Sequence, residues 1–251
     1  MTVTCLTCKR FTVRERTTHA RVDIEMRALA MGRCKKDTNP NRFVPAVALP
    51  LYIKAGNPQL ADVPHAQRMA DLQTLARLLK DNRDAIVQAI HQDYGNRSEF
   101  ETLFAEFFVV LETLKDAQKN LKKWMKPQRR HIDRLMYPGA SNRVIPQPLG
   151  VVGVIVPWNF PLNLSFCPLA AIFAAGNRAM VKMSENSGHL AALLMAITPN
   201  YFPEDKLKFF NDPGDRGPGF SSIPFDHLLF TGSSTTGRSV MANAAEIGRA
   251  S

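Results

Sequence analysis

The feature that most constrains the fold of this 251-residue chain is an unbroken apolar run at residues 151–156, Val-Val-Gly-Val-Ile-Val. β-Branched residues favour extended backbone, and the run lacks the apolar–polar alternation of a strand with one face in water. It therefore predicts a strand buried on both faces, as in a parallel sheet covered by helices. The longest apolar stretch, roughly Leu149 to Trp158, is far shorter than the ~20 residues that a membrane-spanning helix needs.

Strands and helices alternate after this run. Further strands are predicted at Ala179–Lys182, Leu207–Phe210 and His227–Phe230, after a short extended segment at Arg143–Pro146. Helical spacing predicts helices at Leu162–Ala175, ending at Gly176-Asn177, and at Ser187–Ile197 and Thr235–Ala245. This alternation over about 143–246 predicts an α/β fold with an open, mostly parallel, Rossmann-like sheet.

A helical pair is predicted ahead of the sheet, over about 62–126. In the first helix, apolar residues recur at three and four from Asp62 to Asp93, with a break indicated near Asp81-Asn82. In the second helix, Ser98 and Glu101 match a capping box. Its expected apolar face consists of Phe100, Leu103, Phe104, Phe107, Leu111, Leu114, Leu121 and Trp124.

The formal net charge of +10 comes from two segments. Residues 1–45 hold ten Lys/Arg and four Asp/Glu, and residues 119–134 hold seven Lys/Arg and one Asp, so each contributes +6 and the remainder is −2. Lysines in the last turn of a helix suit its dipole, and a solvated arm explains such a patch more often than a polyanion site does. Nucleic acid is therefore not an expected partner.

Residues 1–45 show no sustained periodicity and are expected to be a disordered leader, separate from a domain at 46–251. They contain no apolar secretory segment, and Glu15, Asp23 and Glu25 argue against a mitochondrial transit peptide, so we expect a cytoplasmic protein without a membrane anchor.

Two cysteines of this leader, Cys5 and Cys8, have the spacing of metal ligands. Their only available partners are His19 and Cys34, and this set matches structural zinc sites poorly, so no metal is expected.

Three loops follow the predicted strands at the edge where doubly wound sheets bind ligands. In the first, Pro157–Pro161, the amide of Asn159 suits a developing oxyanion. In the second, Lys182–Glu185, the carboxylate suits a ribose; in the third, Phe230–Gly237, small residues at a helix start suit a phosphate. Singly, a proline-bounded turn, a surface ion pair and an ordinary helix start explain these loops at least as well.

Taken together and in this order, the loops resemble those of the aldehyde dehydrogenase superfamily. The resemblance rests on Pro-Leu-Gly-Val-Val-Gly-Val-Ile-Val-Pro-Trp-Asn-Phe-Pro at 148–161, Ala-Ala-Gly-Asn-Arg-Ala-Met-Val-Lys-Met-Ser-Glu at 174–185, and Phe-Asp-His-Leu-Leu-Phe-Thr-Gly-Ser at 225–233. The nearest members are class-3-like enzymes, which include coniferyl aldehyde dehydrogenases. The resemblance implies oxidation of an aldehyde to a carboxylic acid, with a cysteine thiolate as nucleophile, a glutamate as general base and NAD, or alternatively NADP, as hydride acceptor.

The resemblance also implies roles for individual residues. Asn159 matches the oxyanion-stabilising asparagine, and Lys182 and Glu185 match the ribose-binding pair. The carboxylate favours NAD, because it would repel the 2′-phosphate of NADP. The other cofactor-binding positions are Gly232, Ser233 and Gly237 at the phosphate, and the lining segment Ile155, Val156, Pro157 and Trp158.

Departures from the family pattern shape the functional expectation. The family's Glu-Leu-Gly-Gly segment, with its general base, is expected beyond Ser251, and the nucleophile further on; Cys167 is expected to be buried with a raised pKa. Met183 replaces a usual proline, and Asn211-Asp212-Pro213 replaces a glycine-rich turn. We therefore expect the cofactor-binding half of a homo-oligomeric family, without turnover alone. The alternative is a non-catalytic dinucleotide-binding or interaction fragment.

Overall fold

The computed structural model describes residues 63–133, 135–137, 139–211 and 217–246, and three short strands nearer the N-terminus. These strands, Phe11–Thr12 (β1), Met31–Cys34 (β2) and Val44–Pro45 (β3), form an antiparallel sheet of order β1-β2-β3. The rest of the expected leader, with Cys5, Cys8 and His19, lies outside the described residues. Within the described residues, no group of His, Cys, Asp and Glu is placed to hold a metal ion.

A four-stranded parallel sheet forms the centre of the fold. Its strands are β6 (Val151–Ile155), β7 (Arg178–Lys182), β8 (Leu207–Phe210) and β9 (His227–Phe230), in the order β8-β7-β6-β9. The predicted strands and their parallel arrangement are confirmed. The last residues of all four strands are in register, so the carboxyl ends of the strands lie along one edge of the sheet.

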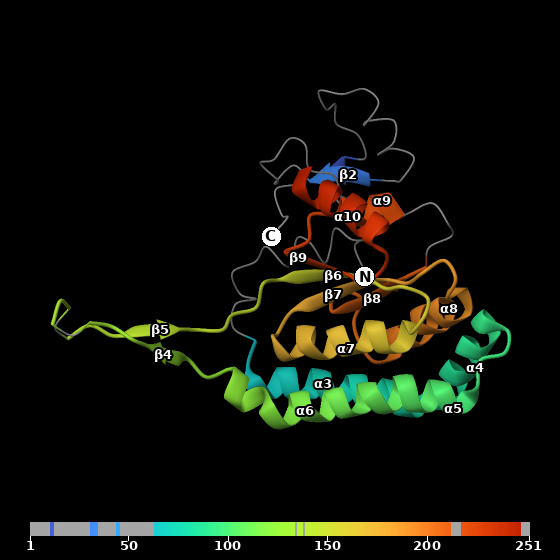
Figure 1. The fold of residues 1–251 in the computed structure, drawn as a ribbon, viewed down its shortest axis with the longest axis horizontal. Coiled ribbons are helices and arrows are strands. Elements are labelled where there is room, and N and C mark those ends of the chain that lie inside the picture. The colour runs from blue at the N-terminus through green and yellow to red at the C-terminus, as the bar shows by residue number, and fades with distance from the viewer. Residues whose placement is uncertain are drawn as a thin grey trace.

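Helices cover the two faces of this sheet (Figure 1). On one face lie α7 (Pro161–Ala174) and α8 (Gly188–Ile197), the latter extended by a 3-10 turn, η4 (Thr198–Asn200). On the other face lie α9 (Gly217–Ser221) and α10 (Ser234–Glu246). The chain winds outward from β6 in one direction through β7 and β8, and then returns to β9 on the other side of β6. This reversal makes the boundary between β6 and β9 the topological switch point of a doubly wound fold.

The helical pair forms an outer layer beneath α7 (Figure 1). It consists of α3 (His65–Asp81), α4 (Arg83–Tyr94), α5 (Glu99–Glu101), the π-helical segment η3 (Thr102–Phe108) and α6 (Val109–Trp124). The indicated break between the first two helices is confirmed at Asn82.

The prediction for the start of the second helix is wrong in two respects. Ser98 occupies the N-cap position, but its side chain makes no capping hydrogen bond. The expected apolar face is only partly the buried one: Phe100, Phe104 and Trp124 are exposed, whereas Leu103 and Leu111 are partly buried against the core. Phe100 and Phe104 lie before or within the π-helical segment, whose longer repeat changes the face that a 3.6-residue period predicts. The expected positions Phe107, Leu114 and Leu121 are confirmed as buried, and the other buried side chains of η3 and α6 are Thr102, Glu106, Val110 and Ala117.

Two hydrophobic clusters pack against the opposite faces of the sheet. Val152 and Val154 belong to the larger cluster, which joins the sheet to α7, α8 and the helical pair. Val151 and Ile155 belong to the smaller cluster, which includes residues of α9 and α10. The apolar run at residues 151–156 is therefore buried on both faces of the sheet, as predicted.

A two-stranded ribbon projects from the body of the protein between the helical pair and the sheet (Figure 1). It pairs β4 (Gln128–Arg130) with β5 (Asn142–Val144) in an antiparallel register, and all six residues are exposed. The extended segment predicted at Arg143–Pro146 begins in this ribbon. Among the helices in the described part of the chain, none is both long and apolar enough to cross a lipid bilayer.

Candidate functional site

The sheet brings the three sequence-predicted loops together at the switch point. Ile155 is in register with Lys182 on one side and with Phe230 on the other. Two further backbone hydrogen bonds hold the loop starts together: the Val156 amide donates to the Lys182 carbonyl at 3.0 Å, and the Thr231 amide donates to the Ile155 carbonyl at 3.2 Å. The loops therefore leave the sheet at adjacent points, where a doubly wound fold binds its ligand.

The lining segment of the first loop changes from buried to exposed along its length. Ile155 and Val156 are buried in the two clusters, Pro157 is half-buried, and the Trp158 side chain is 53% exposed. Asn159 is exposed, and its side-chain amide has no hydrogen-bond partner among the described residues. The loop is a proline-bounded turn, and it still leaves this amide available to a ligand.

In the second loop, the two predicted ribose ligands lie in different environments. Lys182 is only 7% exposed, so a surface ion pair does not describe it. Glu185 is exposed, in a turn closed by a 3.0 Å hydrogen bond from the Ser187 amide to the Ser184 carbonyl. The amide of Met183 donates to the Phe210 carbonyl at 2.9 Å, a bond that proline could not make. This departure from the family pattern therefore extends the pairing of β7 with β8.

Carboxylates from the helical pair cap the helices that follow the first two loops. Glu106 accepts hydrogen bonds from the amides of Leu162 (2.7 Å) and Asn163 (3.1 Å) at the start of α7. Asp93 accepts hydrogen bonds from the amides of His189 (2.8 Å) and Leu190 (3.0 Å) at the start of α8. Helix N-termini favour anions, and these two already have them from within the chain.

The helix after the third loop has an open N-terminus. The Ser233 side chain accepts a 3.2 Å hydrogen bond from the Thr236 amide, and the Ser233 carbonyl accepts one from Gly237. The amides of Ser234 and Thr235 make no hydrogen bond within the described part of the chain. An anion at this edge of the sheet would therefore bind at α10 rather than at α7 or α8.

The two glycines of the third loop lie against the ring of Phe230. A Cβ atom on Gly232 would lie 2.6 Å from the Phe230 ring, and one on Gly237 would lie 3.2 Å from it. Side chains at these positions would push the loop away from the sheet or displace the ring. Glycine at both positions therefore lets the Phe230 ring pack against the backbone at the start of α10.

Cys167 lies on α7, beyond the Asn159 loop. It is half-buried, and its thiol lies 3.5 Å from the Thr113 hydroxyl. Burial raises the pKa of this thiol, and the hydrogen bond to Thr113 opposes the shift only in part. The expected raised pKa is confirmed, which makes Cys167 a poor thiolate nucleophile.

Sequence reasoning missed the residues that support the first two loops. Tyr94 and Arg97 donate hydrogen bonds to the Asn159 carbonyl, at 2.5 Å and 2.9 Å, and Asp93 and Glu106 cap the adjoining helices. A signal existed only for Glu106, because it is the one carboxylate on the face that the helix buries. A buried carboxylate requires a partner, but the sequence does not reveal which one.

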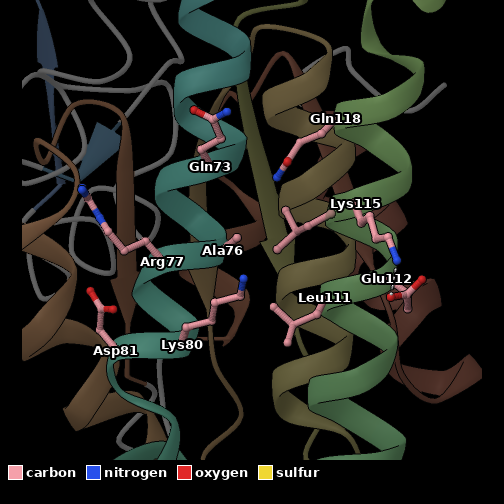
Figure 2. Close-up of a pocket in the computed structure, with 10 residues that line it drawn as sticks. Gln73, Ala76, Arg77, Lys80, Asp81, Leu111, Glu112, Lys115 and Gln118 are labelled. Carbon is pink, nitrogen blue, oxygen red and sulfur yellow. Dashed lines mark hydrogen bonds and ion pairs between the residues drawn. The ribbon is translucent and has the colours of Figure 1, made fainter.

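A separate groove of about 490 Å³ lies between α3 and α6, on the outer helical layer (Figure 2). Charges of both signs line it, among them Arg77, Lys80, Asp81, Glu112 and Lys115. None of the loops at the switch point contributes a residue to it.

Comparison with known proteins identifies the family and the fold. Residues 53–251 match the model of the aldehyde dehydrogenase family, which is well over half of the chain. The chain belongs to this family. A relative described as a probable coniferyl aldehyde dehydrogenase, from Pseudomonas aeruginosa, is 48% identical over 180 residues. These residues are 72% of this chain and 38% of that relative, so the chain spans about two fifths of the relative's length.

Solved structures of aldehyde dehydrogenases share the architecture. The substrate-bound structure of Staphylococcus aureus AldH superposes with a TM-score of 0.72 at 25% identity, covering 79% of this chain and 43% of that one. An NAD-dependent benzaldehyde dehydrogenase from Corynebacterium glutamicum superposes with a TM-score of 0.65 at 26% identity, covering 78% of this chain and 43% of that one. These neighbours confirm the predicted α/β, Rossmann-like fold.

Proposed function

We propose that residues 63–246 form the cofactor-binding part of an NAD-dependent aldehyde dehydrogenase that oxidises aromatic aldehydes to carboxylic acids. The observation that carries this proposal is the meeting of three features at the switch point: the unpartnered Asn159 amide, the exposed Glu185 and the open N-terminus of α10. Together they offer an oxyanion donor, a ribose acceptor and a phosphate site at the edge where doubly wound folds bind dinucleotides.

The residues of this chain fit a dinucleotide in three ways. The amides of Ser234 and Thr235, with the partial positive charge of α10, bind the pyrophosphate, and Gly232 lets it approach the backbone. Glu185 would accept hydrogen bonds from the ribose hydroxyls, and Lys182, the last residue of β7, begins the same loop. Pro157 and the half-exposed Trp158 would line the cofactor site.

In the chemical step, the role of this part of the chain is to stabilise charge. Attack on an aldehyde carbonyl places negative charge on its oxygen, and the Asn159 amide donates a hydrogen bond to that oxygen. When bound, the nicotinamide supplies the hydride acceptor. Cys167 does not supply the attacking thiolate, because its pKa is raised and its thiol faces Thr113. We therefore expect the 251-residue chain by itself to show no reduction of NAD+ by aromatic aldehydes.

Relatives support the aldehyde class. The Pseudomonas aeruginosa relative is described as a probable coniferyl aldehyde dehydrogenase, and the Corynebacterium structure is that of a benzaldehyde dehydrogenase. Both names denote aldehydes attached to, or conjugated with, an aromatic ring. We propose the same class for the full enzyme to which this stretch corresponds.

Calorimetric titration of the chain with NAD+ and with NADP+ tests the proposed cofactor. NAD+ should bind more tightly, because Glu185 accepts from a free ribose and repels a 2′-phosphate. Glu185→Ala should weaken NAD+ binding by about tenfold, the effect of losing hydrogen bonds to a charged acceptor. The same substitution should also reduce the difference in affinity between NAD+ and NADP+.

Glu204→Ala is the matched control for this titration. Glu204 is an exposed carboxylate just ahead of β8, at the opposite edge of the sheet, where it pairs with Lys208 at 3.1 Å. Its loss should leave both affinities unchanged. A folded wild-type chain that binds neither cofactor would favour the alternative, a non-catalytic interaction fragment. Equal effects of Glu185→Ala and Glu204→Ala on the affinity for NAD+ would show that the ribose does not bind at Glu185.

A further inference from the structure

Besides the three loops, the structure contains a polar cluster formed by the half-buried Tyr94 and the buried Arg97 and Glu106. These residues come from α4, η3 and the segment between them, and all three contact the backbone of the Asn159 loop or the helix that follows it. We infer that Tyr94, Arg97 and Glu106 are positioning residues, which set the direction of the Asn159 amide by fixing the backbone on both sides of it.

The carbonyl groups of the loop are held by side chains rather than by the sheet. The Tyr94 hydroxyl lies 2.5 Å from the carbonyl oxygens of both Trp158 and Asn159, and Arg97 Nη1 donates to the Asn159 carbonyl at 2.9 Å. Burial raises the pKa of Tyr94, so its hydroxyl keeps the proton that it donates. The peptide that carries the Asn159 side chain is therefore oriented from the helical pair.

Glu106 fixes the other end of the loop. Its side chain is completely buried; Oε2 accepts from the Leu162 and Asn163 amides, and Oε1 lies 3.4 Å from Arg97 Nη2. One carboxylate thus contacts both the first turn of α7 and the guanidinium that holds Asn159. A shift of α7 would disturb this ion pair, so loop and helix move together.

Packing confines Arg97 to this geometry. Its side chain is 3% exposed, and its guanidinium lies 4.6 Å from the ring centre of Tyr94 and 4.9 Å from that of Phe160. A second carboxylate, Glu101, lies 3.4 Å from Nη2 but is half-exposed. A buried arginine stacked between two rings has few alternative rotamers, which suits a group that must hold a backbone in place.

The Asn159 side chain has no partner of its own among the described residues, so its backbone sets the position and direction of the Cα–Cβ bond from which the amide projects. Oxyanion donors work because they are oriented before charge develops, and a catalytic group must be held within about 0.5 Å of its working position. Because Asn159 is an oxyanion donor only under the function proposed above, the catalytic importance of the cluster depends on that function. The effect of the cluster on the conformation of the Asn159 loop does not depend on that function.

Tyr94→Phe tests the inference with a minimal change, because it removes the hydroxyl and keeps the ring beneath Arg97. Trp124→Phe serves as the background, since it leaves Trp158 as the only tryptophan. In that background, Tyr94→Phe should raise the population of displaced loop by about fivefold, the factor expected for one lost hydrogen bond. Stronger acrylamide quenching of Trp158 fluorescence would report this change.

Nuclear magnetic resonance follows Asn159 itself, with its side-chain amide signals assigned by their loss in Asn159→Asp. Tyr94→Phe, Arg97→Lys and Glu106→Gln should each shift or broaden those signals while most other amide signals keep their positions. The matched control is Tyr201→Phe, which removes a hydroxyl that binds Asp81 and Asn82, each at 3.0 Å, away from the loop. It should leave Trp158 and Asn159 unchanged.

Unchanged Trp158 quenching and unchanged Asn159 signals in folded Tyr94→Phe and Arg97→Lys would overturn the inference, because the loop would then hold its own conformation. These measurements need no cofactor, so they remain informative if the wild-type chain fails to bind NAD+. That failure would contradict the proposed function and leave the positioning of the loop supported.

Discussion

Single atoms decide whether a position in the central strand tolerates a side chain. A Cβ atom on Gly153 would lie 2.6 Å from the Phe225 ring and 2.8 Å from Leu228 Cδ1. Gly153→Ala should therefore lower the free energy of unfolding by about 1–3 kcal/mol, the usual cost of overpacking a core. Urea denaturation measures this change.

Gly188 provides the matched control for that substitution. It begins α8, and a Cβ atom there would have no heavy atom within 4 Å. Gly188→Ala should leave the stability unchanged or raise it slightly, because alanine favours the helix more than glycine does. Equal losses in the two variants would show that the close approach of Phe225 does not limit position 153.

The reactivity of Cys167 tests its raised pKa. Burial keeps the thiol protonated to a higher pH than the ordinary value of 9.0, so at pH 8 its thiolate fraction is below that of a free thiol. Alkylation by iodoacetamide, resolved by peptide mapping, should be slower at Cys167 than at cysteine in a short unstructured peptide. The rate of alkylation at Cys167 should still increase with pH above pH 9. A faster rate than the peptide would contradict the pKa shift.

Sequence reasoning indicated candidate residues where the pattern that marks them lies within one loop. It indicated Asn159, Lys182, Glu185 and the small residues of the third loop, and the structure brings these loops together. It did not indicate Tyr94, Arg97 or Asp93, because each acts on backbone more than 60 residues away in the chain. Which of these residues bind cofactor stays a prediction.

At the scale of elements, the cap of α8 depends on another helix. The Asp93 side chain is 3% exposed and accepts from two amides of the first turn of α8 and from the His189 ring at 2.9 Å. Asp93→Ala should cost about 1–2 kcal/mol of stability, because it leaves those amides uncapped. Asp84→Ala, at an exposed carboxylate of α4, should cost much less stability. Thermal denaturation measures both changes, and similar losses of stability in the two variants would contradict the capping role of Asp93.

The cap of α7 should give stability a distinctive pH dependence. Burial raises the pKa of Glu106 above its ordinary 4.5, although the Asn163 amide, Arg97 and the Leu162 amide oppose this shift. Between 4.5 and the folded-state pKa, the native chain retains a proton that the unfolded chain has released, so this group's contribution to stability falls as pH rises.

Glu106→Gln removes that titration. The free energy of unfolding of the wild type, relative to that of this variant, should therefore decline as pH rises from about 4 to the folded-state pKa of Glu106. Urea denaturation of both chains at several pH values measures the difference, and a constant difference would contradict the raised pKa.

Elements with a regular period were predicted to within one or two residues, and irregular ones were not. The strands β8 and β9 have the predicted bounds, because short apolar runs between turns leave little freedom. The π-helical segment at Thr102–Phe108, in which Glu106 is buried near Arg97, was missed, since no local residue pattern predicts a π-helix. The exposed stack of Phe100, Phe104 and Phe108 follows from the same turn.

At the scale of the whole molecule, the helical pair and the sheet share one core. The larger hydrophobic cluster includes residues of α3, α6, α7 and β6, so the pair supports the loops from beneath. The α/β fold class and the layer of helices were predictable, because alternating patterns permit few topologies. The proposed boundary at residue 46 stays a prediction, because residues 46–62 lie outside the described residues.

The central claim, that a dinucleotide binds at the switch point between β6 and β9, is tested most directly by mapping amide chemical shifts of the isotopically labelled chain during titration with NAD+. The largest changes should fall on residues 157–160 and 231–236, including the Trp158 indole and the amides of Ser234 and Thr235. Residues at the opposite edge of the sheet, such as Asn177 and Lys206, should keep their positions. Changes confined to that opposite edge or to the groove between α3 and α6, or no changes at saturating NAD+, would contradict the claim.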